Sequence, residues 1–424
     1  MTVPIIAQRA KEASRVVALA TTDQKNAVIH GMSVRLAARK SEIVAANLAD
    51  VAEVITKGKP THFIDRLGFG EEKIEARIRA LGKIEALPDP VGRPYGLKHL
   101  PNGLEVMRVR VPLGVVLMIY EARPHVTVNA GAFCLKSGNS AILRGGSEAK
   151  RCNELLGMLW RESLAEAGLP CESIQVVTGS HEEISDLLKQ SQFIDLVIPR
   201  GGRDLIETVN KNSKIPVIKH YSGVCHVYLD EFVDIEKGIE IALDSKCLMP
   251  EVCNAMETLL VCQELSSELP RIVEAFRGSG VEVRGCKRTQ ALVPDLRGAT
   301  EADWRTEYLD HIVSMRVVTD VDDAIEHVNS YGSHHTDAIV TDSAENAEKF
   351  TQQVDSAVVL ANASTMFCDG ESLGMGAEIG ISTDKLHARG PMGLEELTSY
   401  KFVIRGDGHV MGDPKMFMKE AKNR

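Results

Sequence analysis

The hydrophobic positions of the first 86 residues recur with the spacing of amphipathic helices. Val28, Met32 and Leu36 follow one another at intervals of one helical turn, with polar residues between them. We therefore expect residues 1–86 to form consecutive helices. Residues 88–96, with three prolines and two glycines, interrupt the pattern.

A period of two follows this break and predicts a strand at residues 104–111. Met107, Val109 and Val111 alternate there with Arg108 and Arg110, which is typical of a strand with one face in water.

From residue 115 onward, short continuous apolar runs alternate with amphipathic stretches. We expect strands at residues 115–120, 140–144, 174–179, 195–200, 257–263, 281–286, 311–318, 337–341 and 357–363. Helices are expected between them, at residues 124–137, 147–167, 181–190, 203–212, 234–245, 321–329 and 343–353. Apolar strands alternating with helices imply parallel sheets covered on both faces. The pattern predicts two doubly wound α/β units with a boundary near residues 228–232.

Composition narrows the class of protein. A formal net charge of −10 leaves no basic footprint for nucleic acid. No apolar run is long enough to span a bilayer, and Arg9, Lys11 and Glu12 interrupt the N-terminal stretch in which a signal peptide needs apolar residues. The nine cysteines form no CxxC pair, so neither a metal site nor a disulfide framework is expected. We expect a cytoplasmic chain with reduced thiols.

Two strand-to-helix turns are rich in glycine, and such turns let a backbone approach a phosphate closely. Ligands of open α/β sheets bind beyond the carboxyl ends of the strands, where both turns fall. An alternative is two tight turns without a ligand, the first with Ser147 as a helix cap. The turns consist of Arg144, Gly145, Gly146, Ser147 and Glu148, and of Arg200, Gly201 and Gly202.

Cys253 differs from the other cysteines in its surroundings. It follows Pro250 on a predicted loop that leads into a buried strand, whereas Cys134 and Cys262 lie within apolar runs. A thiol held rigidly on a loop can act as a nucleophile, although a free cysteine is more often a small core residue.

Several long blocks resemble one known family. They cover residues 111–149, 197–202, 252–261, 337–350 and 376–404, for example VCNAMETLLV at 252–261. On these blocks the chain resembles the gamma-glutamyl phosphate reductases, a branch of the aldehyde dehydrogenase superfamily. The resemblance implies an aldehyde dehydrogenase-like fold, with two doubly wound α/β domains and a small β oligomerisation arm.

The resemblance also implies domain limits. Residues 1–98 and 112–230 would form the cofactor-binding domain, and residues 231–365 the catalytic domain. Residues 99–111 and 398–410 would form the arm strands, with 366–397 as a returning segment.

Site residues follow from the same resemblance. It implies that Cys253 is the nucleophile and that the first α/β unit binds NADPH. The turn at residues 144–148 would lie along the adenosine half of the cofactor, and the turn at 200–202 near the pyrophosphate. Glu307 would hold the nicotinamide ribose, although it could equally be an ordinary residue at a strand start.

The chain departs from the family pattern at several positions. His220 lies at about the place where hydrolytic relatives carry a water-activating glutamate, and the absence of a glutamate there favours phosphate over water as the acceptor of the thioester's acyl group. His125 stands where relatives often have asparagine, so the oxyanion donors are the Cys253 amide with Asn254 or His125. Met366 stands where an arginine is usual, which leaves a substrate contact from that loop in doubt.

The expected activity is NADPH-dependent reduction of L-glutamyl 5-phosphate, with Arg123 and Arg389 binding its carboxylate or phosphate. Each arginine could instead form a structural ion pair. The substrate would come from a separate glutamate 5-kinase, which allows a transient contact between the two proteins. A homo-oligomer, dimer or tetramer, is expected because the arm strands would otherwise be uncovered. The alternatives are a relative acting on a coenzyme A thioester and a catalytically silent binding subunit.

Overall fold

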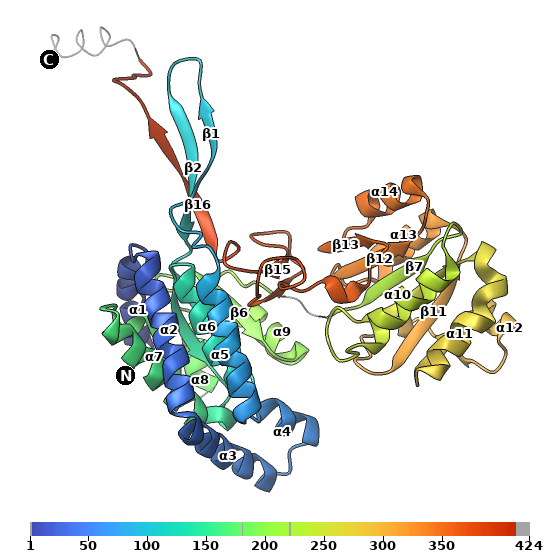
Figure 1. Ribbon diagram of the computed structural model, residues 1–424, viewed down its shortest axis with the longest axis horizontal. Coiled ribbons are helices and arrows are strands. Elements are labelled where there is room, and N and C mark those ends of the chain that lie inside the picture. Colours follow the sequence, from blue (N-terminus) through green and yellow to red (C-terminus); the bar gives the residue numbers. More distant parts are fainter. Residues whose placement is uncertain (1, 180, 220–221, 413–424) are drawn as a thin grey trace.

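The computed structural model describes residues 2–179, 181–219 and 222–412. Figure 1 shows two α/β domains side by side, with a β arm projecting from the first of them. The mixed α/β architecture with parallel sheets confirms the predicted fold class.

The first domain is built on a parallel sheet, the first sheet, with strand order β5-β4-β3-β6. Its strands are β3 (Val115–Tyr120), β4 (Ser140–Arg144), β5 (Ile174–Val177) and β6 (Leu196–Arg200). Its helices are α1 (Val3–Val17), α2 (Thr22–Ala38), α3 (Lys40–Thr56), α4 (Thr61–Leu67), α5 (Glu71–Ala86), α6 (Pro124–Lys136), α7 (Lys150–Glu166), α8 (His181–Leu187) and α9 (Arg203–Asn212).

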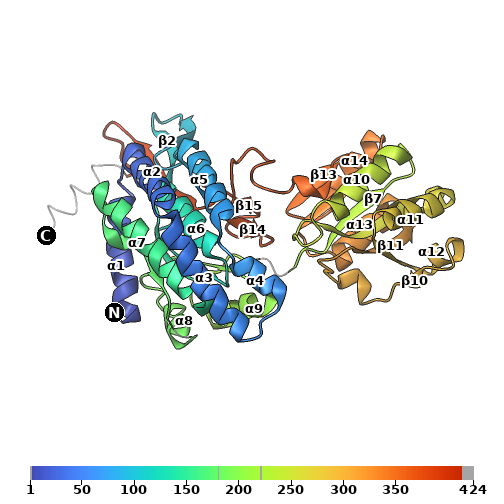
Figure 2. The same ribbon diagram turned by 60° about the horizontal axis from the view of Figure 1, so that its bottom comes forward.

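Alternate side chains of β3 enter two different cores, which explains why this strand is apolar without interruption. Val116 and Met118 pack with residues of α2, α5, α6 and α7, and these helices lie together on one side of the sheet (Figure 2). Val115 and Leu117 pack with residues of α1, α8 and α9 on the other side. Both faces of the first sheet are therefore covered.

The second domain has a longer parallel sheet, the second sheet, with strand order β10-β9-β11-β8-β7-β12-β13. Its strands are β7 (Cys225–Leu229), β8 (Met256–Cys262), β9 (Glu282–Gly285), β10 (Arg297–Gly298), β11 (Ile312–Val318), β12 (Thr336–Val340) and β13 (Val358–Ala361). Its helices are α10 (Ile235–Cys247), α11 (Leu269–Gly278), α12 (Lys287–Leu292), α13 (Val321–Tyr331) and α14 (Ala344–Gln353). Helices α10 and α11 cover one face, and α13 and α14 cover the other.

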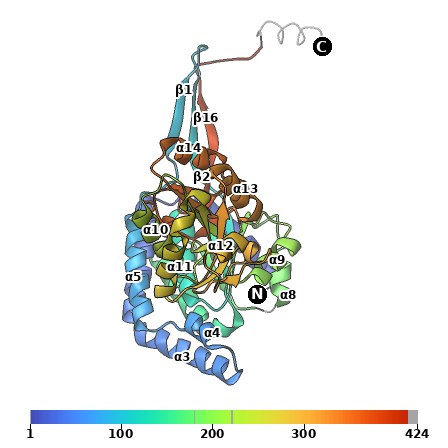
Figure 3. The same cartoon turned by 90° about the vertical axis from the view of Figure 1, so that its right-hand side faces the viewer.

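The arm is an antiparallel sheet of β1 (Pro94–His99), β2 (Glu105–Pro112) and β16 (Thr398–Arg405), and it extends beyond both domains (Figure 3). Between the second domain and β16, the chain returns to the first domain through β14 (Gly380–Ser382) and β15 (Gly390–Met392). Met392 and Leu397 of this returning segment lie in the core of the first domain.

Two of the expected domain limits need correction. β1 pairs with β2, so the arm begins at Pro94 and not at residue 99. β7 pairs with β8 and β12, so the second sheet begins before the boundary that we expected near residues 228–232. Both errors concern strand pairing, which brings together residues far apart in the sequence.

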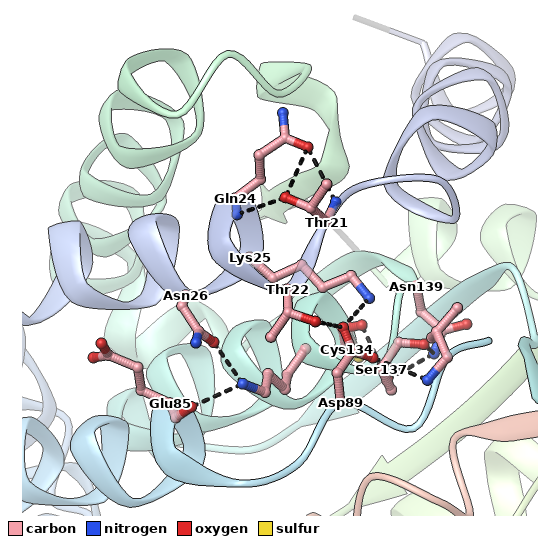
Figure 4. A network of polar contacts seen from close by, with 12 residues as sticks. Thr21, Thr22, Gln24, Lys25, Asn26, Glu85, Asp89, Cys134, Ser137 and Asn139 are labelled. Atoms are coloured by element: carbon pink, nitrogen blue, oxygen red, sulfur yellow. Dashed lines mark hydrogen bonds and ion pairs between the residues drawn. The ribbon is translucent and has the colours of Figure 1, made fainter. Parts of the chain in front are cut away.

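Two fully buried lysines of the first domain, Lys25 and Lys136, have hydrogen-bond or ion-pair partners. Lys25 of α2 is fully buried, and its Nζ lies 2.8 Å from Oδ2 of Asp89, which also accepts from the Thr22 hydroxyl (Figure 4). Lys136 of α6 donates to the Asn26 side chain and to the Glu85 carbonyl, 2.8 Å away. These bonds join α2 to the end of α5 and to α6.

Within the described part of the chain, no helix is long and apolar enough to cross a membrane.

Candidate active site

Cys253 lies on the loop between α10 and β8, at the side of the second domain that faces the first. Its side chain is partly exposed, whereas the neighbouring Asn254 is buried. Burial raises the pKa of the Cys253 thiol to about 11. Among the nearby charges, Arg200 lowers this pKa and the carboxylates of Glu378 and Glu307 raise it. Arg200 is therefore the group that favours the thiolate.

The backbone of Cys253 packs closely against the backbone of Gly223. A Cβ at Gly223 would lie 1.7 Å from the Cys253 carbonyl oxygen, so no side chain fits there. The Cys225 thiol donates to the same oxygen at 3.3 Å. The loop that carries Cys253 is thus packed directly on the segment that leads into β7.

Asn254 uses its side-chain amide to hold another loop. Its Nδ2 donates to the carbonyls of Thr365 at 3.1 Å and Met366 at 3.3 Å, with the Cys368 carbonyl 3.4 Å away. In this arrangement the Asn254 side-chain amide is engaged by protein carbonyls. Met366 is buried, so it presents no polar group in place of the arginine that is usual there.

Arg200 comes from the first domain, at the carboxyl end of β6. Among the described residues, no hydrogen bond or ion pair engages its guanidinium, which lies against the returning segment. A Cβ at Gly380 would be 3.2 Å from Arg200 Nη1. The site is therefore assembled from both domains and the returning segment.

The two glycine turns lie at the carboxyl edge of the first sheet, as the sequence predicted. The Gly202 amide, at the start of α9, already donates to Glu121 Oε2 at 3.2 Å. Arg144 is buried, and its Nη2 donates to the Gly179 carbonyl at 3.1 Å, so it joins the ends of β4 and β5. The rest of the first turn, from Gly145 through Ser147 to Glu148, leads into α7 by way of a short 3₁₀ turn at Ser147–Ala149.

Cations gather around His125, in the first turn of α6. Burial lowers the pKa of His125 to about 3, and Arg77 and Arg123 lower it further, followed by Lys73 and Arg200. His125 is therefore neutral near pH 7. Within the described residues, the guanidiniums of Arg77 and Arg123 have neither an ion pair nor a hydrogen bond, and burial lowers the pKa of both.

Glu307 lies just before β11, on the second-domain side of the site. Its Oε1 accepts the Gly223 amide at 2.7 Å, and burial raises its pKa. The structure thus brings Glu307 beside the Gly223 backbone, on which the Cys253 loop is packed.

Arg389 has a different environment from Arg123. Its Nη1 lies 2.9 Å from Asp355 Oδ1, and its Nη2 donates to the Asp355 carbonyl at 3.0 Å. Lys385 contacts the same carboxylate at 2.8 Å. Arg389 thus joins the returning segment to the turn between α14 and β13, which is the structural ion pair considered as its alternative. His220 lies outside the described residues.

Sequence reasoning missed Arg77, Gly223 and Glu378. Glu378 lies within the block 376–404 that carried the resemblance, so the sequence did mark its surroundings. Arg77 has no such signal, because it is one of many charged residues on an amphipathic helix. Its place beside His125 becomes visible only when α5 packs beside α6.

Comparisons with known proteins show to which family the chain belongs. The sequence model of the "Aldehyde dehydrogenase family" matches residues 1–280. A gamma-glutamyl phosphate reductase of Desulforapulum autotrophicum is 51% identical over 407 residues, which are 96% of this chain and 97% of that protein.

Solved structures of two further relatives share the fold. The gamma-glutamyl phosphate reductase of Thermotoga maritima is 42% identical, with a TM-score of 0.95 over 97% of this chain and 100% of that chain. The Saccharomyces cerevisiae enzyme of the same name is 33% identical, with a TM-score of 0.54 over 96% of this chain and 98% of that chain. The chain is therefore an oxidoreductase that belongs to the aldehyde dehydrogenase family, and within it resembles the gamma-glutamyl phosphate reductases over nearly its whole length.

Proposed function

We propose that the protein reduces L-glutamyl 5-phosphate to L-glutamate 5-semialdehyde with release of phosphate, using NADPH, in the second step of proline biosynthesis from glutamate. The observation that carries the proposal is the partly exposed Cys253, whose backbone packs on Gly223, with the positive charge of Arg200, which has no partner among the described residues, acting on its thiol. The 51% identity to a protein named gamma-glutamyl phosphate reductase supports the same substrate.

In this mechanism the Cys253 thiolate attacks the acyl carbon, and the bond from that carbon to the phosphate oxygen breaks. The departing phosphate takes up a proton, and the acyl group remains as a thioester on Cys253. The Cys253 amide donates to the oxyanion of the tetrahedral intermediate. Arg200 and Arg123 stabilise the phosphate while it leaves, since guanidinium matches phosphate oxygens in a bidentate fork.

Reduced nicotinamide, when bound, supplies the hydride that brings the acyl carbon to the aldehyde level. The resulting oxyanion collapses and expels the Cys253 thiolate, which releases the aldehyde and restores the enzyme. The pKa of His125 is low enough for the side chain to stay neutral throughout, so it can donate a hydrogen bond without adding charge.

The carboxyl edge of the first sheet fits a dinucleotide. Gly201 and Gly202 precede α9, which has no side-chain cap, so amides at its start are available to a phosphate. A diphosphate there would replace Glu121 as the acceptor of the Gly202 amide. We propose the turn from Gly145 to Glu148 for the adenosine half and Glu307 for the nicotinamide ribose. We expect NADPH to be preferred over NADH, and comparable kcat/KM values for the two cofactors would contradict this expectation.

The arm supports a homo-oligomer. Tyr400, Phe402 and Ile404 of the edge strand β16 are 45%, 58% and 59% exposed, and Arg108 stacks on the first two of these rings. An exposed apolar edge strand of this kind is stable in solution when another chain covers it. Light scattering at micromolar concentration should show at least a dimer, and a monodisperse monomer would contradict the proposal.

The decisive experiment measures NADPH formation from L-glutamate 5-semialdehyde while phosphate, arsenate and coenzyme A are titrated separately. Saturable activation by phosphate or arsenate is expected, because reversal of the reaction requires phosphate to accept the acyl group. Equal rates without any acceptor would identify a hydrolytic dehydrogenase. Activation by coenzyme A alone would identify an acyl-coenzyme A reductase, and no turnover at all a silent homologue.

A further inference from the structure

A cavity of about 400 Å³ lies between α5, α6 and the start of the returning segment. Its size is within the range of small-molecule sites, which is about 300–1,000 Å³. It is lined on one side by Ala76, Arg77, Arg79, Ala80, Lys83 and Asn129, and on the other side by Asp369, Glu371, Gly376, Ala377 and Glu378. One wall is therefore cationic and the other acidic.

Most of these charges already have partners. Lys83 pairs with Glu371 at 2.5 Å, where both side chains are more than half exposed. Asp369 Oδ1 accepts the backbone amides of Glu371 and Ser372 at 2.8 and 3.0 Å. The Lys83–Glu371 pair lies at the rim of the cavity, and Asp369 holds the turn at residues 369–372. These groups are already engaged within the protein.

Four polar groups of the lining have no such partner in the described part of the chain, and one of them, the Arg79 guanidinium, is exposed to solvent, whereas the other three are at least partly buried. The Arg77 guanidinium is half-buried and forms no ion pair or hydrogen bond. The Asn129 Oδ1 atom is buried and accepts no hydrogen bond. Glu378 uses Oε2 to accept the Gly370 amide at 3.0 Å and leaves Oε1 unpaired. Burial without a partner is costly for such groups, and that cost disappears when a ligand supplies the partner.

The cavity adjoins the nucleophile. Glu378, which lines it, acts electrostatically on both Arg200 and Cys253. On the opposite wall, Arg77 acts on His125 at the start of α6, where Arg123 and Arg200 also converge. A substrate whose acyl group is at Cys253 can therefore extend its far end into the cavity.

We propose that this cavity binds the α-amino-acid head group of the substrate, an inference that rests on the function proposed above. Arg77 donates to the α-carboxylate, and Glu378 Oε1 and Asn129 Oδ1 accept from the α-ammonium. A zwitterion matches two walls of opposite charge, whereas a simple anion would leave Glu378 uncompensated.

The test uses three aldehydes oxidised in the presence of phosphate. L-Glutamate 5-semialdehyde carries both charged groups, 5-oxopentanoate lacks the ammonium, and 4-aminobutanal lacks the carboxylate. Arg77→Gln should lower kcat/KM for the two carboxylate-bearing aldehydes on the order of 10- to 100-fold and leave 4-aminobutanal nearly unchanged. Arg77→Lys should restore part of the loss because it keeps the charge. Arg15→Gln, at an exposed position on α1, is the matched control.

The effect of Glu378→Gln is measured as the ratio of kcat/KM for two substrates, because any effect of this variant on the Cys253 thiol is the same for both substrates and cancels in the ratio. The preference for L-glutamate 5-semialdehyde over 5-oxopentanoate should fall on the order of 10-fold. A readout without turnover is protection of Cys253 from iodoacetamide by L-glutamate, which should be strong in the wild type and weak in Arg77→Gln.

The two proposals fail in different ways. If the wild type oxidises none of the three aldehydes with phosphate, the proposed function is wrong. If the wild type is active but Arg77→Gln lowers kcat/KM equally for all three aldehydes, or for none of them, the head-group site is wrong and the proposed function stands.

Discussion

Two regions of the molecule enclose positively charged side chains, which have partners within the protein in one region and none among the described residues in the other. Around Lys25 and Lys136 each buried ammonium has an acceptor within the protein, from a carboxylate, an amide or a carbonyl (Figure 4). Around His125, the guanidiniums of Arg77 and Arg123 have none among the described residues. Lys136 and His125 lie on the same helix, α6, so the difference does not follow from which helix carries the charge. Paired charge stabilises the scaffold, and unpaired charge indicates where a ligand is expected.

A third arrangement supports this distinction. Lys246 and Glu257 form a fully buried pair at 2.6 Å in the second domain, although burial still raises the pKa of Glu257 to about 7. Arg389 likewise has Asp355. The comparison predicts that variants of the unpaired groups alter chemistry, whereas variants of the paired groups alter stability.

The largest effect is expected from Cys253→Ser. Turnover should fall at least ~10³-fold, because an alcohol is a far weaker nucleophile at neutral pH, and the free energy of unfolding should hardly change. Cys134→Ser and Cys262→Ser should keep turnover and lose ~1–3 kcal/mol of stability, because they bury a hydroxyl. Inactivation by an alkylating reagent that modifies only another cysteine would refute the role of Cys253.

Asp89→Asn should lower the stability of the protein and leave its turnover unchanged. Removing the carboxylate leaves the Lys25 ammonium buried without its counter-ion, which costs about 3–5 kcal/mol in the free energy of unfolding. Urea denaturation measures this loss, while kcat of the folded enzyme should be unchanged. Adding Lys25→Met should recover part of the stability, and an equal loss in the single and double variants would contradict the ion-pair explanation.

Gly223→Ala tests the support of the nucleophile. The new Cβ would lie 1.7 Å from the Cys253 carbonyl oxygen, so the loop must shift. A displacement of about 1 Å can lower turnover on the order of 10²-fold. Gly82→Ala is a suitable control because no atom lies within 4 Å of its Cβ, and it should raise stability by about 0.5–1 kcal/mol. Unchanged kcat in Gly223→Ala would show that the packing beneath Cys253 is not needed.

The smallest effect concerns the pH dependence of the thiol. With a Cys253 pKa of about 11, the rate of alkylation by iodoacetamide should rise with pH until about that value, since only the thiolate reacts. Arg200→Gln should raise the pKa and slow alkylation at pH 8, and Glu378→Gln should lower the pKa and accelerate it, each by roughly 2- to 10-fold. Shifts in the same direction for both variants would contradict the electrostatic arrangement.

Local patterns were sufficient to predict most elements of both domains. The uninterrupted apolar run at 115–120 predicted a strand buried on both faces, and β3 has that position between two cores. β1 was missed because all its residues are exposed, so it has no apolar alternation, and because Pro94 and Gly96 are tolerated at a sheet edge.

The candidate site was predictable only in part, because a local pattern does not show contacts between residues far apart in the sequence. The resemblance singled out Cys253, and the glycine turns were found from their local sequence. Asn254 was expected to serve the oxyanion because it follows Cys253, but its amide holds the carbonyls of residues 365 and 366, more than 100 positions away.

The sequence by itself determined most helices, the buried strands, the family and the candidate nucleophile, because these depend on local periodicity or on contiguous motifs. Tertiary structure alone decided which sheet β7 joins, which arginine is paired and which is not, and that Arg77 and Glu378 face one cavity. The physical reason is that strand pairing and charge compensation depend on distances in space, and a linear pattern contains no such distances. Arg77 and Arg389 are equally charged in the sequence, and only the fold places Asp355 beside Arg389 while Arg77 has no partner among the described residues.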